Sequence, residues 1–465
     1  MSDDIALREA PQVAGIRPFR AVRYDPALVG DLADVLAPPY DVISPQHQDE
    51  LYARSPFNAV RLEFGREEPD DAPGRDRYTR AAAQYRAWLA QGILRPNGTP
   101  ALYVYEERFS YLEVERVRLG LFAALRLEPW EADVILPHEH TLPKPKADRL
   151  NLLRACKAVF SPIFLLYEDG GEVRCILEAG TEAAAPLVDI RVEPGAVAEA
   201  AERHRVWALD GPAAEQLQAF FAGKRLFIAD GHHRYETALA YRDERRAADP
   251  AAPPVGEAPY DYTLAYLADF DDPGLTVLPI HRLVRNVPDL DRQKLLLALE
   301  RSFSIKILPI APGEFLRQAL AELRRAGQNG AHAFGLVGAA PRAMHLLTLR
   351  PAAHQAWLAR PLTGHSEAWR RLDVSILHTL VLRECLGLGD EAVEGEGQVS
   401  FTRDAEAAVL AVERGEYQLA FLLNPTTPRQ IRDVALAHDR MPQKSSFFWP
   451  KPPAGLVCLD YERSL

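Results

Sequence analysis

Hydrophobic positions along the chain alternate between two patterns, one typical of strands and one typical of helices. Apolar runs of strand length at 163–167, 226–229 and 262–270 predict buried strands. Between them, residues 212–222 carry apolar side chains at helical spacing, with a proline near the expected first turn. This alternation predicts an α/β or mixed α+β fold with mixed sheets.

The same reading predicts further elements throughout the chain. Helices are expected at 76–91, 148–157, 289–303, 313–327, 374–387 and 428–437. Strands are expected at 58–64, 101–109, 114–127, 305–308, 332–337, 344–349 and 417–423, with the second and third as a hairpin. We expect three consecutive regions, 1–178, 179–286 and 287–465.

Composition and charge narrow the possible classes of protein. The chain has 465 residues and a formal net charge of -11, which argues against a general nucleic-acid binder. Its four cysteines are scattered, as expected in a reducing cytoplasm. The first ten residues have no apolar core, and no apolar run is long enough to span a bilayer. We therefore expect a soluble cytoplasmic protein without a membrane or nucleic-acid partner.

Ionisable residues crowd one predicted strand–turn–helix junction, at 225–240. A helix start suits an anion, and Gly231 permits a sharp turn beside it. In the functional interpretation, Asp230 is a base or a magnesium-side carboxylate, and His233 and Arg234 contact a phosphate. The alternative is that Asp230 only caps the helix. His232 and His233 are neighbours, about 100° apart on a helix, and form a poor metal pair.

A second group of polar residues lies at 136–149, in a proline-rich loop before a predicted helix. Lys144, Lys146 and Arg149 could grip phosphate oxygens, and Glu139 could act as a general base. The alternative is a solvated loop in which Asp148 caps the following helix.

Two further segments carry candidate chemistry. Residues 441–452 place Lys444 and Ser445 beside three adjacent aromatic residues, which could bind a nucleotide or simply belong to a core. The proline turn at 37–44 could line a pocket or be a plain loop. P-loop, dinucleotide-binding and nucleophile-elbow motifs are missing, so those three enzyme classes lose support.

Four segments together resemble the widespread prokaryotic family filed as domain of unknown function 1015. They are Pro38-Pro39-Tyr40-Asp41-Val42-Ile43, Pro137-His138-Glu139 through Asp148-Arg149, Ala229 through Glu236, and Met441 through Lys451. They are spread over nearly the whole chain. Because this family has no well-established biochemical role, the resemblance by itself implies little about mechanism.

The Asp-Gly-His-His-Arg segment is also similar to the signature of the ParB-like superfamily, which includes free-serine kinases. Gly231 and Arg234 match its phosphate-binding box, and Asp230 and His233 match catalytic positions of the serine-kinase branch. That branch also uses a glutamate as base, for which Glu139 is the candidate. The resemblance implies a ParB-like nucleotide-binding core with additional α/β domains, and a nucleotide together with Mg²⁺ as cofactors.

These observations support one leading hypothesis and two rivals. The leading hypothesis is an enzyme of kinase or phosphatase type acting on a small polar metabolite, with free serine or phosphoserine implied by the resemblance. Catalysis would use Asp230, His233 and Glu139. Phosphate or nucleotide would contact Gly231, His232, Arg234, Lys144, Lys146, Arg149, Lys444 and Ser445. The rivals are a nucleotide-binding regulatory protein without turnover, and a metal-dependent hydrolase using His138, His140 and His232.

Overall fold

A computed structural model describes residues 14–141, 143–311, 313–360, 364–389, 391–392 and 397–465. The fold is of the mixed α/β class, as predicted from the sequence. Contacts divide the chain into two units. Unit 1 comprises Met1–Pro137, Thr141–Leu275 and Pro450–Leu465, and unit 2 comprises His138–His140 and Thr276–Trp449. Unit 1 thus takes residues from all three regions expected from the sequence, and the three-region organisation itself stays a prediction.

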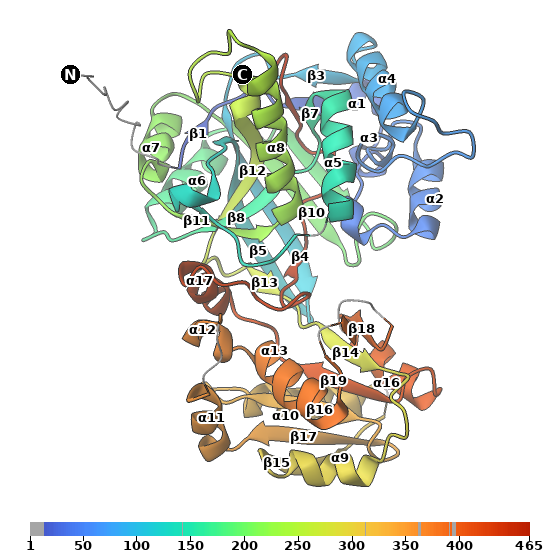
Figure 1. Ribbon diagram of the computed structural model, residues 1–465. Coiled ribbons are helices and arrows are strands. Elements are labelled where there is room, and N and C mark those ends of the chain that lie inside the picture. The colour runs from blue at the N-terminus through green and yellow to red at the C-terminus, as the bar shows by residue number, and fades with distance from the viewer. Residues whose placement is uncertain (1–13, 142, 312, 361–363, 390, 393–396) are drawn as a thin grey trace, which may run out of the picture. The chain divides into compact units, whose positions relative to one another are not determined.

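Unit 1 is built on a mixed sheet that has nine strands among the described residues, in the order β6-β11-β8-β12-β5-β4-β10-β9, with β1 also pairing β5 (Figure 1). The pairs β6–β11 and β8–β12 are parallel, and the others are antiparallel, including the predicted hairpin β4–β5. The strands are β1 (Ile16–Arg17), β4 (Leu102–Tyr111), β5 (Val114–Arg126), β6 (Ile135–Leu136), β8 (Ile163–Tyr167), β9 (Val188–Val192), β10 (Glu202–Leu209), β11 (Leu226–Asp230) and β12 (Tyr262–Asp269).

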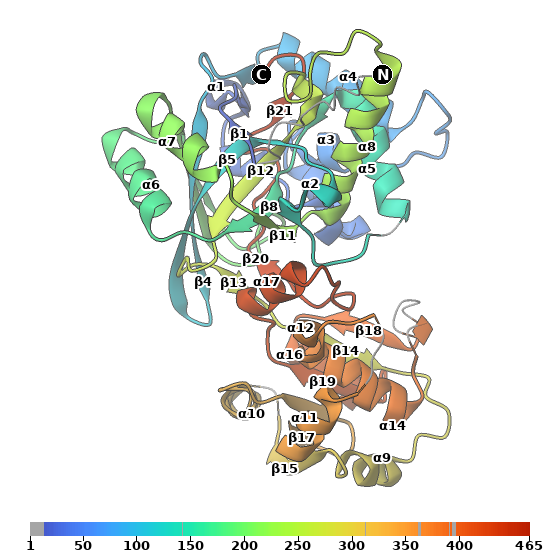
Figure 2. The ribbon, with the colours of Figure 1, turned by 60° about the vertical axis from the view of Figure 1, so that its left-hand side comes forward.

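Two hydrophobic cores lie among the described residues of unit 1. The first packs apolar residues of the sheet against α6 (Glu172–Ala183), α7 (Gly211–Phe221) and α8 (His232–Ala248). The second joins α4 and α5 to two small antiparallel strand pairs, β2–β3 and β7–β21. Helices α5 and α8 lie side by side (Figures 1 and 2). The remaining bounds are α1 (Pro26–Val29), α2 (Pro45–Arg54), α3 (Val60–Glu63), α4 (Arg77–Ala90), α5 (Pro143–Cys156), β2 (Val22–Tyr24), β3 (Leu94–Pro96), β7 (Ala158–Val159) and β21 (Leu459–Asp460).

One predicted strand in unit 1 is wrong. The apolar–polar alternation at 58–64 belongs to the short helix α3 and the turn that precedes it. The Asn58 amide fixes this turn, because its oxygen accepts from the Val60 N–H at 2.9 Å while its nitrogen donates to the Leu36 carbonyl at 2.7 Å. These local bonds, and burial of the segment on more than one side, outweigh the strand pattern.

Unit 2 contains a six-stranded antiparallel sheet among its described residues, in the order β15-β17-β16-β19-β14-β18. The strands are β14 (His281–Val284), β15 (Phe303–Pro309), β16 (Ala333–Val337), β17 (Ala343–Leu349), β18 (Val399–Thr402) and β19 (Leu419–Leu423), with a separate pair β13 (Thr276–Val277) and β20 (Phe448–Trp449). The helices are α9 (Arg292–Leu299), α10 (Glu314–Ala326), α11 (Pro351–Leu358), α12 (Glu367–Arg370), α13 (Asp373–Ile376), α14 (Glu384–Leu386), α16 (Ala405–Glu413) and α17 (Pro428–Leu436).

The helix predicted at 374–387 is helical but not uniform, because a π-helical stretch at Leu377–Arg383 separates α13 from α14. Most other predicted elements of unit 2 are confirmed to within a few residues. Among the described residues, none of the helices combines the length and hydrophobicity that crossing a membrane requires.

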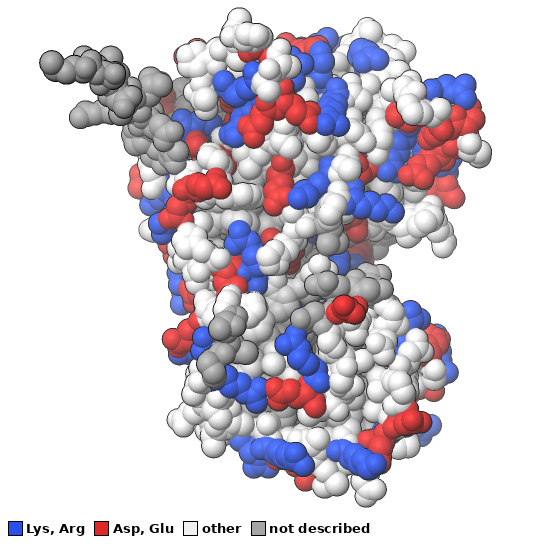
Figure 3. Space-filling model, in the orientation of Figure 1, with Lys and Arg blue, Asp and Glu red and all other residues white. Residues whose placement is uncertain are grey.

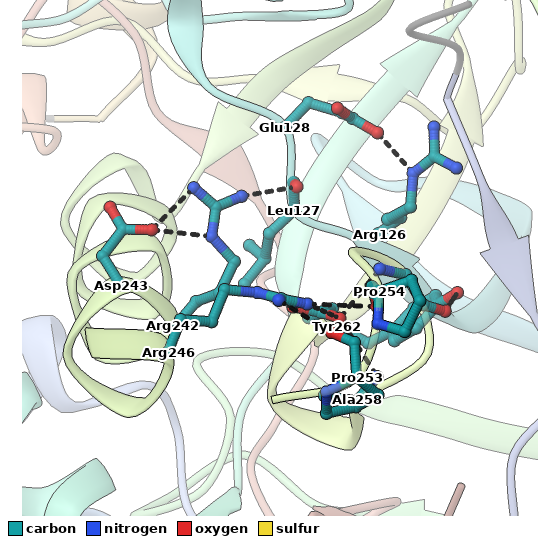
Figure 4. A network of polar contacts seen from close by, with 12 residues as sticks. Arg126, Leu127, Glu128, Arg242, Asp243, Arg246, Pro253, Pro254, Ala258 and Tyr262 are labelled. Atoms are coloured by element: carbon teal, nitrogen blue, oxygen red, sulfur yellow. Dashed lines mark hydrogen bonds and ion pairs between the residues drawn. The ribbon is translucent and has the colours of Figure 1, made fainter. Parts of the chain in front are cut away.

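Polar contacts fix the carboxyl-terminal half of α8 to the loops beside it (Figure 4). Arg242 donates to the Leu127 carbonyl at 2.8 Å, and Arg246 donates to the Pro253 carbonyl at 3.0 Å. Arg246 also pairs with Asp261, whose side chain is fully buried. Asp261 accepts in addition from the Gly256 and Ala258 N–H groups. These contacts fix the orientation of the helix that begins at the candidate site.

We predict that Asp261→Asn destabilises the protein. Loss of the buried carboxylate leaves Arg246 without its ionic partner and should cost about 3 kcal/mol in free energy of unfolding. Urea unfolding followed by tryptophan fluorescence measures this change. The control is Asp243→Asn, because Asp243 pairs with Arg242 at the surface and should contribute little. Equal stability of both variants would contradict the structural role of Asp261.

Candidate functional site

The predicted strand–turn–helix is confirmed, with β11 ending at Asp230 and α8 beginning at His232. Gly231 joins them with φ +95, a backbone conformation that side chains other than glycine rarely adopt. A Cβ placed at residue 231 would lie 3.0 Å from Nε of Arg234. The first turn of α8 is fixed by Tyr235, whose hydroxyl donates to the Glu128 carbonyl at 2.7 Å. Both the dihedral and the close approach therefore require glycine at the turn.

Asp230 does not cap the helix, so this alternative from the sequence is wrong. The residue at the N-cap is Gly231, without a side-chain cap. The Asp230 carboxylate instead binds two cations, Arg234 through one oxygen and Lys451 through the other, at 2.6 Å from the Lys451 Nζ. Lys451 also pairs with Asp41. Asp41, Lys451, Asp230 and Arg234 thus form a continuous chain of ion pairs with formal charges that cancel, which we call the ion-pair chain.

The ion-pair chain lies mostly inside unit 1. The side chain of Lys451 is 7% exposed, that of Arg234 10% and that of Asp230 20%. Burial alone would lower the pKa of Lys451, but Asp230 and Asp41 outweigh it and raise this pKa above its ordinary value. Burial would also lower the pKa of Arg234, but the neighbouring carboxylates, above all Asp230, outweigh it and raise this pKa. Lys451 and Arg234 therefore remain charged in spite of their burial, because the carboxylates of Asp230 and Asp41 lie nearby.

Arg234 is held tightly on its inner side. Besides Asp230 it donates to the Pro162 carbonyl, while its buried Nε has no hydrogen-bond partner. The guanidinium of Arg234 also lines a small cavity of about 40 Å³ together with Glu63 and Ser161. In this structure Arg234 therefore supports Asp230 from within instead of extending into solvent.

Arg149 is buried beside the ion-pair chain. It contacts Glu63 at 3.2 Å and Asp148 at 2.6 Å, and its guanidinium lies over the Tyr40 ring, 4.0 Å from the ring centroid. Burial raises the pKa of Glu63 in spite of Arg149, and burial also raises the pKa of Tyr40 to about 12. The proline turn at 37–44 thus contacts Arg149 through Tyr40, and its lining of a ligand pocket stays a prediction.

Asp148 does not cap the helix either, because α5 begins at Pro143 and places Asp148 inside it. Its carboxylate accepts from the Tyr78 hydroxyl at 2.8 Å and pairs with Arg77 and Arg149. Burial would raise the pKa of Asp148, but Arg149 and Arg77 outweigh it and lower this pKa. The cap expectation failed because the helix extends into the proline-containing segment.

A second cluster of polar residues, Glu236, Lys146 and Thr141, lies beside the first turns of α8. Glu236 accepts from Lys146 at 2.9 Å and from the Thr141 hydroxyl at 2.6 Å. Burial lowers the pKa of His233, Glu236 opposes this, and Lys146 lowers the pKa further. Two residues of the predicted Lys/Arg loop, Lys146 and Arg149, therefore lie close to Asp230 and His233 in unit 1.

The remaining predicted site residues are placed as follows. His232 is buried, and Lys144 is exposed on the first turn of α5. Glu139, Lys444 and Ser445 belong to unit 2. There, Glu139 contacts the Ser446 hydroxyl at 3.4 Å, and the Ser445 hydroxyl donates to the Pro442 carbonyl. Phe448 and Trp449 are buried, in agreement with the core interpretation of these aromatic residues.

Metal binding by the predicted histidines has no support in the described residues. Within that part of the chain, the groups with suitable spacing are Glu107, Glu202 and His204, and Glu68, Asp70 and Asp71. Neither includes His138, His140 or His232.

On the face that Figure 3 shows, positive and negative side chains of the described residues are interspersed.

Sequence reasoning missed two members of the ion-pair chain, Asp41 and Lys451. Both lie in segments that carried the family resemblance, which was the signal that could have found them. Asp41 and Lys451 both lie beside Asp230 because the chain, after forming most of unit 2, returns to unit 1 at Pro450. Hydrophobic patterning contains no information about that return.

Comparison with known proteins gives a family but no activity. A sequence model of the family described as "Protein of unknown function (DUF1015)" matches residues 16–375, most of the chain. None of the curated proteins matches the chain.

Three solved structures are reported as similar to this chain, all at low identity and with low TM-scores. A conserved hypothetical protein from Pyrococcus furiosus is 13% identical with a TM-score of 0.32, and the match covers 75% of this chain and 98% of that chain. A free serine kinase in complex with AMP is 13% identical with a TM-score of 0.31, covering 71% and 86%. SbnI with C-terminal truncation from Staphylococcus aureus is 11% identical with a TM-score of 0.32, covering 72% and 87%. Matches this weak assign no activity to this chain.

We predict that Lys146→Met raises the pKa of His233, because the substitution removes a nearby positive charge and leaves Glu236 without its cation. Titration of the imidazole resonances by NMR measures this. In the parent, the folded-state pKa lies below the ordinary value of 6.5. The unfolded state therefore binds more protons in that window, and the stability from this group is lost as pH falls through it. The control is Lys144→Met on the same helix, and an equal shift in both variants would refute the local interaction.

We predict that Lys451→Met lowers the free energy of unfolding by about 3 kcal/mol, because it leaves the mostly buried Asp230 with Arg234 as its one remaining cation and removes the partner of the exposed Asp41. The measurement is the urea midpoint at neutral pH. Lys157→Met removes an exposed partner of Glu462 and serves as the matched control, with little expected loss. A Lys451→Met protein as stable as this control would show that the ion-pair chain does not stabilise unit 1.

Proposed function

Because the chain belongs to the family of proteins of unknown function called DUF1015, its activity has to be inferred from its own residues, and we propose that it transfers a phosphoryl group to or from a small polar metabolite. The observation that carries this proposal is the position of Asp230. Its carboxylate is fixed by Lys451 and Arg234 where β11 ends and the positive end of the α8 dipole begins. Open α/β sheets commonly bind ligands at such strand ends.

Each residue of the turn has a defined part in this proposal. The backbone at Gly231 and His232, at the start of α8, approaches phosphate oxygens. Asp230 orients the hydroxyl nucleophile, and His233, neutral at pH 7 through its lowered pKa, accepts or returns a proton. Lys451 supplies positive charge where the phosphoryl group is transferred. Arg234 holds Asp230 in position and contacts phosphate only if that pair opens.

Free serine is the proposed substrate if a nucleotide donates the phosphoryl group, and phosphoserine is the proposed substrate in the phosphatase direction, in which water accepts the phosphoryl group. The support is the match of Gly231, Arg234, Asp230 and His233 to the box of the ParB-like serine kinases, which also supports a ParB-like core in unit 1. Lys144 and Lys146 remain proposed contacts to phosphate, and the roles of Glu139 as second base and of Lys444 and Ser445 as phosphate contacts, all three in unit 2, stay predictions from the sequence. Arg149 has the weakest case as a phosphate contact, because Glu63 and Asp148 already occupy its guanidinium. We also propose that the protein is cytoplasmic, as expected if it uses a nucleotide.

Magnesium fits this site only as a partner of the nucleotide. Asp41 and Asp230 offer the oxygen donors that Mg²⁺ prefers, but both already bind Lys451, so they do not form a protein cage for a metal ion. When bound with nucleotide phosphates, Mg²⁺ would neutralise their charge, with Asp230 as its protein ligand.

One observation favours a second candidate, a nucleotide-binding regulatory protein without turnover. Lys451 and Arg234 are both already paired with carboxylates, and the formal charges of the ion-pair chain cancel. A ligand phosphate would have to displace a carboxylate, and such a displacement could change the conformation of the chain without chemistry.

Incubation of the full chain with a nucleotide, Mg²⁺ and serine tests the two candidates. Mass spectrometry should detect phosphoserine with the parent protein. Asp230→Asn should lower kcat by about 10²–10³, the loss typical when a group that stabilises the transition state is removed. The control is Asp243→Asn, since Asp243 lies at the surface farther along α8. Nucleotide binding without product supports the regulatory candidate, and equal turnover by parent and Asp230→Asn refutes the proposed role of Asp230.

A further inference from the structure

Unit 2 contains a polar pocket of about 430 Å³ that does not depend on the proposed phosphoryl transfer. It lies where β19 ends and β16 begins, at the ends of the two central strands of the antiparallel sheet. Its volume falls in the range of small-molecule sites, about 300–1,000 Å³. The pocket is lined by polar side chains from several elements, including His332, His354, Arg371, Asp373, Thr427 and Asp433.

His332 is held in one orientation at the wall of this pocket. Its Nδ1 lies 2.6 Å from the Asp373 carboxylate, and both residues are mostly buried. A carboxylate partner on Nδ1 fixes the orientation of the imidazole ring. The ring therefore has a defined position at the pocket wall.

His354, on α11, lies against this pair. The rings of His332 and His354 are 4.7 Å apart between centroids and meet edge to face. The Nε2 of His354 is buried and has no hydrogen-bond partner. Burial lowers the pKa of His354, and the neighbouring His332 and Arg371 lower it further. A buried ring nitrogen without a partner is costly unless a ligand or water satisfies it.

The remaining wall adds positive potential. Thr427 is the N-cap of α17, a helix of nine residues, so the positive end of the helix dipole faces the same pocket. Arg371 contributes a guanidinium that is also paired with the exposed Glu367. Two carboxylates oppose them, Asp373, which is paired with His332, and Asp433, which is paired with Arg432. When His354 is neutral, the two carboxylates outnumber the one guanidinium of the lining, and protonation of His354 balances these charges.

We propose that this pocket binds a small oxyanion, a phosphate-type or carboxylate group, and that binding is coupled to proton uptake by His354. The anion lies between His354, Arg371 and the amino end of α17. Its negative charge removes the repulsion that disfavours protonation of His354, and by linkage the protonated pocket binds the anion more tightly. The site is therefore empty at high pH and filled as pH falls.

NMR titration of histidine resonances in the full chain tests this proposal. Sulfate is the first probe, because its charge stays constant between about pH 5.5 and about pH 8, where histidine titrates. Trifluoroacetate is the second probe and represents carboxylates. Sulfate should raise the pKa of His354 by about one unit, equivalent to tenfold tighter binding by the protonated form. The probe with the larger effect identifies the class of ligand.

Two controls make the result decisive. His345 on β17 is outside the pocket lining, so its pKa should not respond. His354→Gln should abolish the pH dependence of sulfate affinity, whereas Arg324→Gln, which removes an exposed charge from α10, should preserve it. The proposal is overturned if both probes leave the pKa of His354 unchanged, or if they shift His345 equally.

Discussion

Buried charge is the constraint on which the organisation of unit 1 depends. A carboxylate at the end of β11 is stable inside the protein only if cations reach it, and Asp230 obtains two, Arg234 from the first turn of α8 and Lys451 from the chain terminus. Lys451 in turn requires Asp41 from the beginning of the chain. Three segments far apart in sequence are therefore tied at one point, and removal of any member leaves an uncompensated charge.

This constraint connects the fold to the proposed function. The glycine at 231 permits the turn, and the anchoring of Tyr235 and Arg246 fixes the helix that follows, so the Asp230 carboxylate has a defined position. Fixed charges at a helix start are the elements that phosphoryl transfer uses, because that reaction depends on positioning and electrostatic stabilisation. The same contacts make the resting site electrically neutral, so a phosphate must exchange with a carboxylate to enter.

Local patterns in the sequence predicted the elements well where one signal dominated. The apolar run and glycine around 226–231 predicted β11, the turn and α8, and apolar residues at helical spacing predicted α4 at 76–91. The prediction failed at 58–64, where the Asn58 amide and burial produce α3, and at Asp148, where α5 starts earlier than the expected cap. The spacing of apolar residues reveals neither the bonds of the Asn58 amide nor the early start of α5.

The sequence also predicted some residues of the candidate site and missed others. Asp230, His233 and Arg234 share one short segment, so the sequence revealed them together, and Lys146 was found because it lies in a loop rich in charge. Asp41 and Lys451 were not identified, since nothing local indicates that residue 451 returns to residue 230. A crystal structure of the full chain with a nucleoside diphosphate tests the central claim most directly. The account predicts phosphate oxygens within hydrogen-bond distance of the Gly231–His232 backbone and of Lys451. An intact ion-pair chain with the nucleotide bound elsewhere would contradict it.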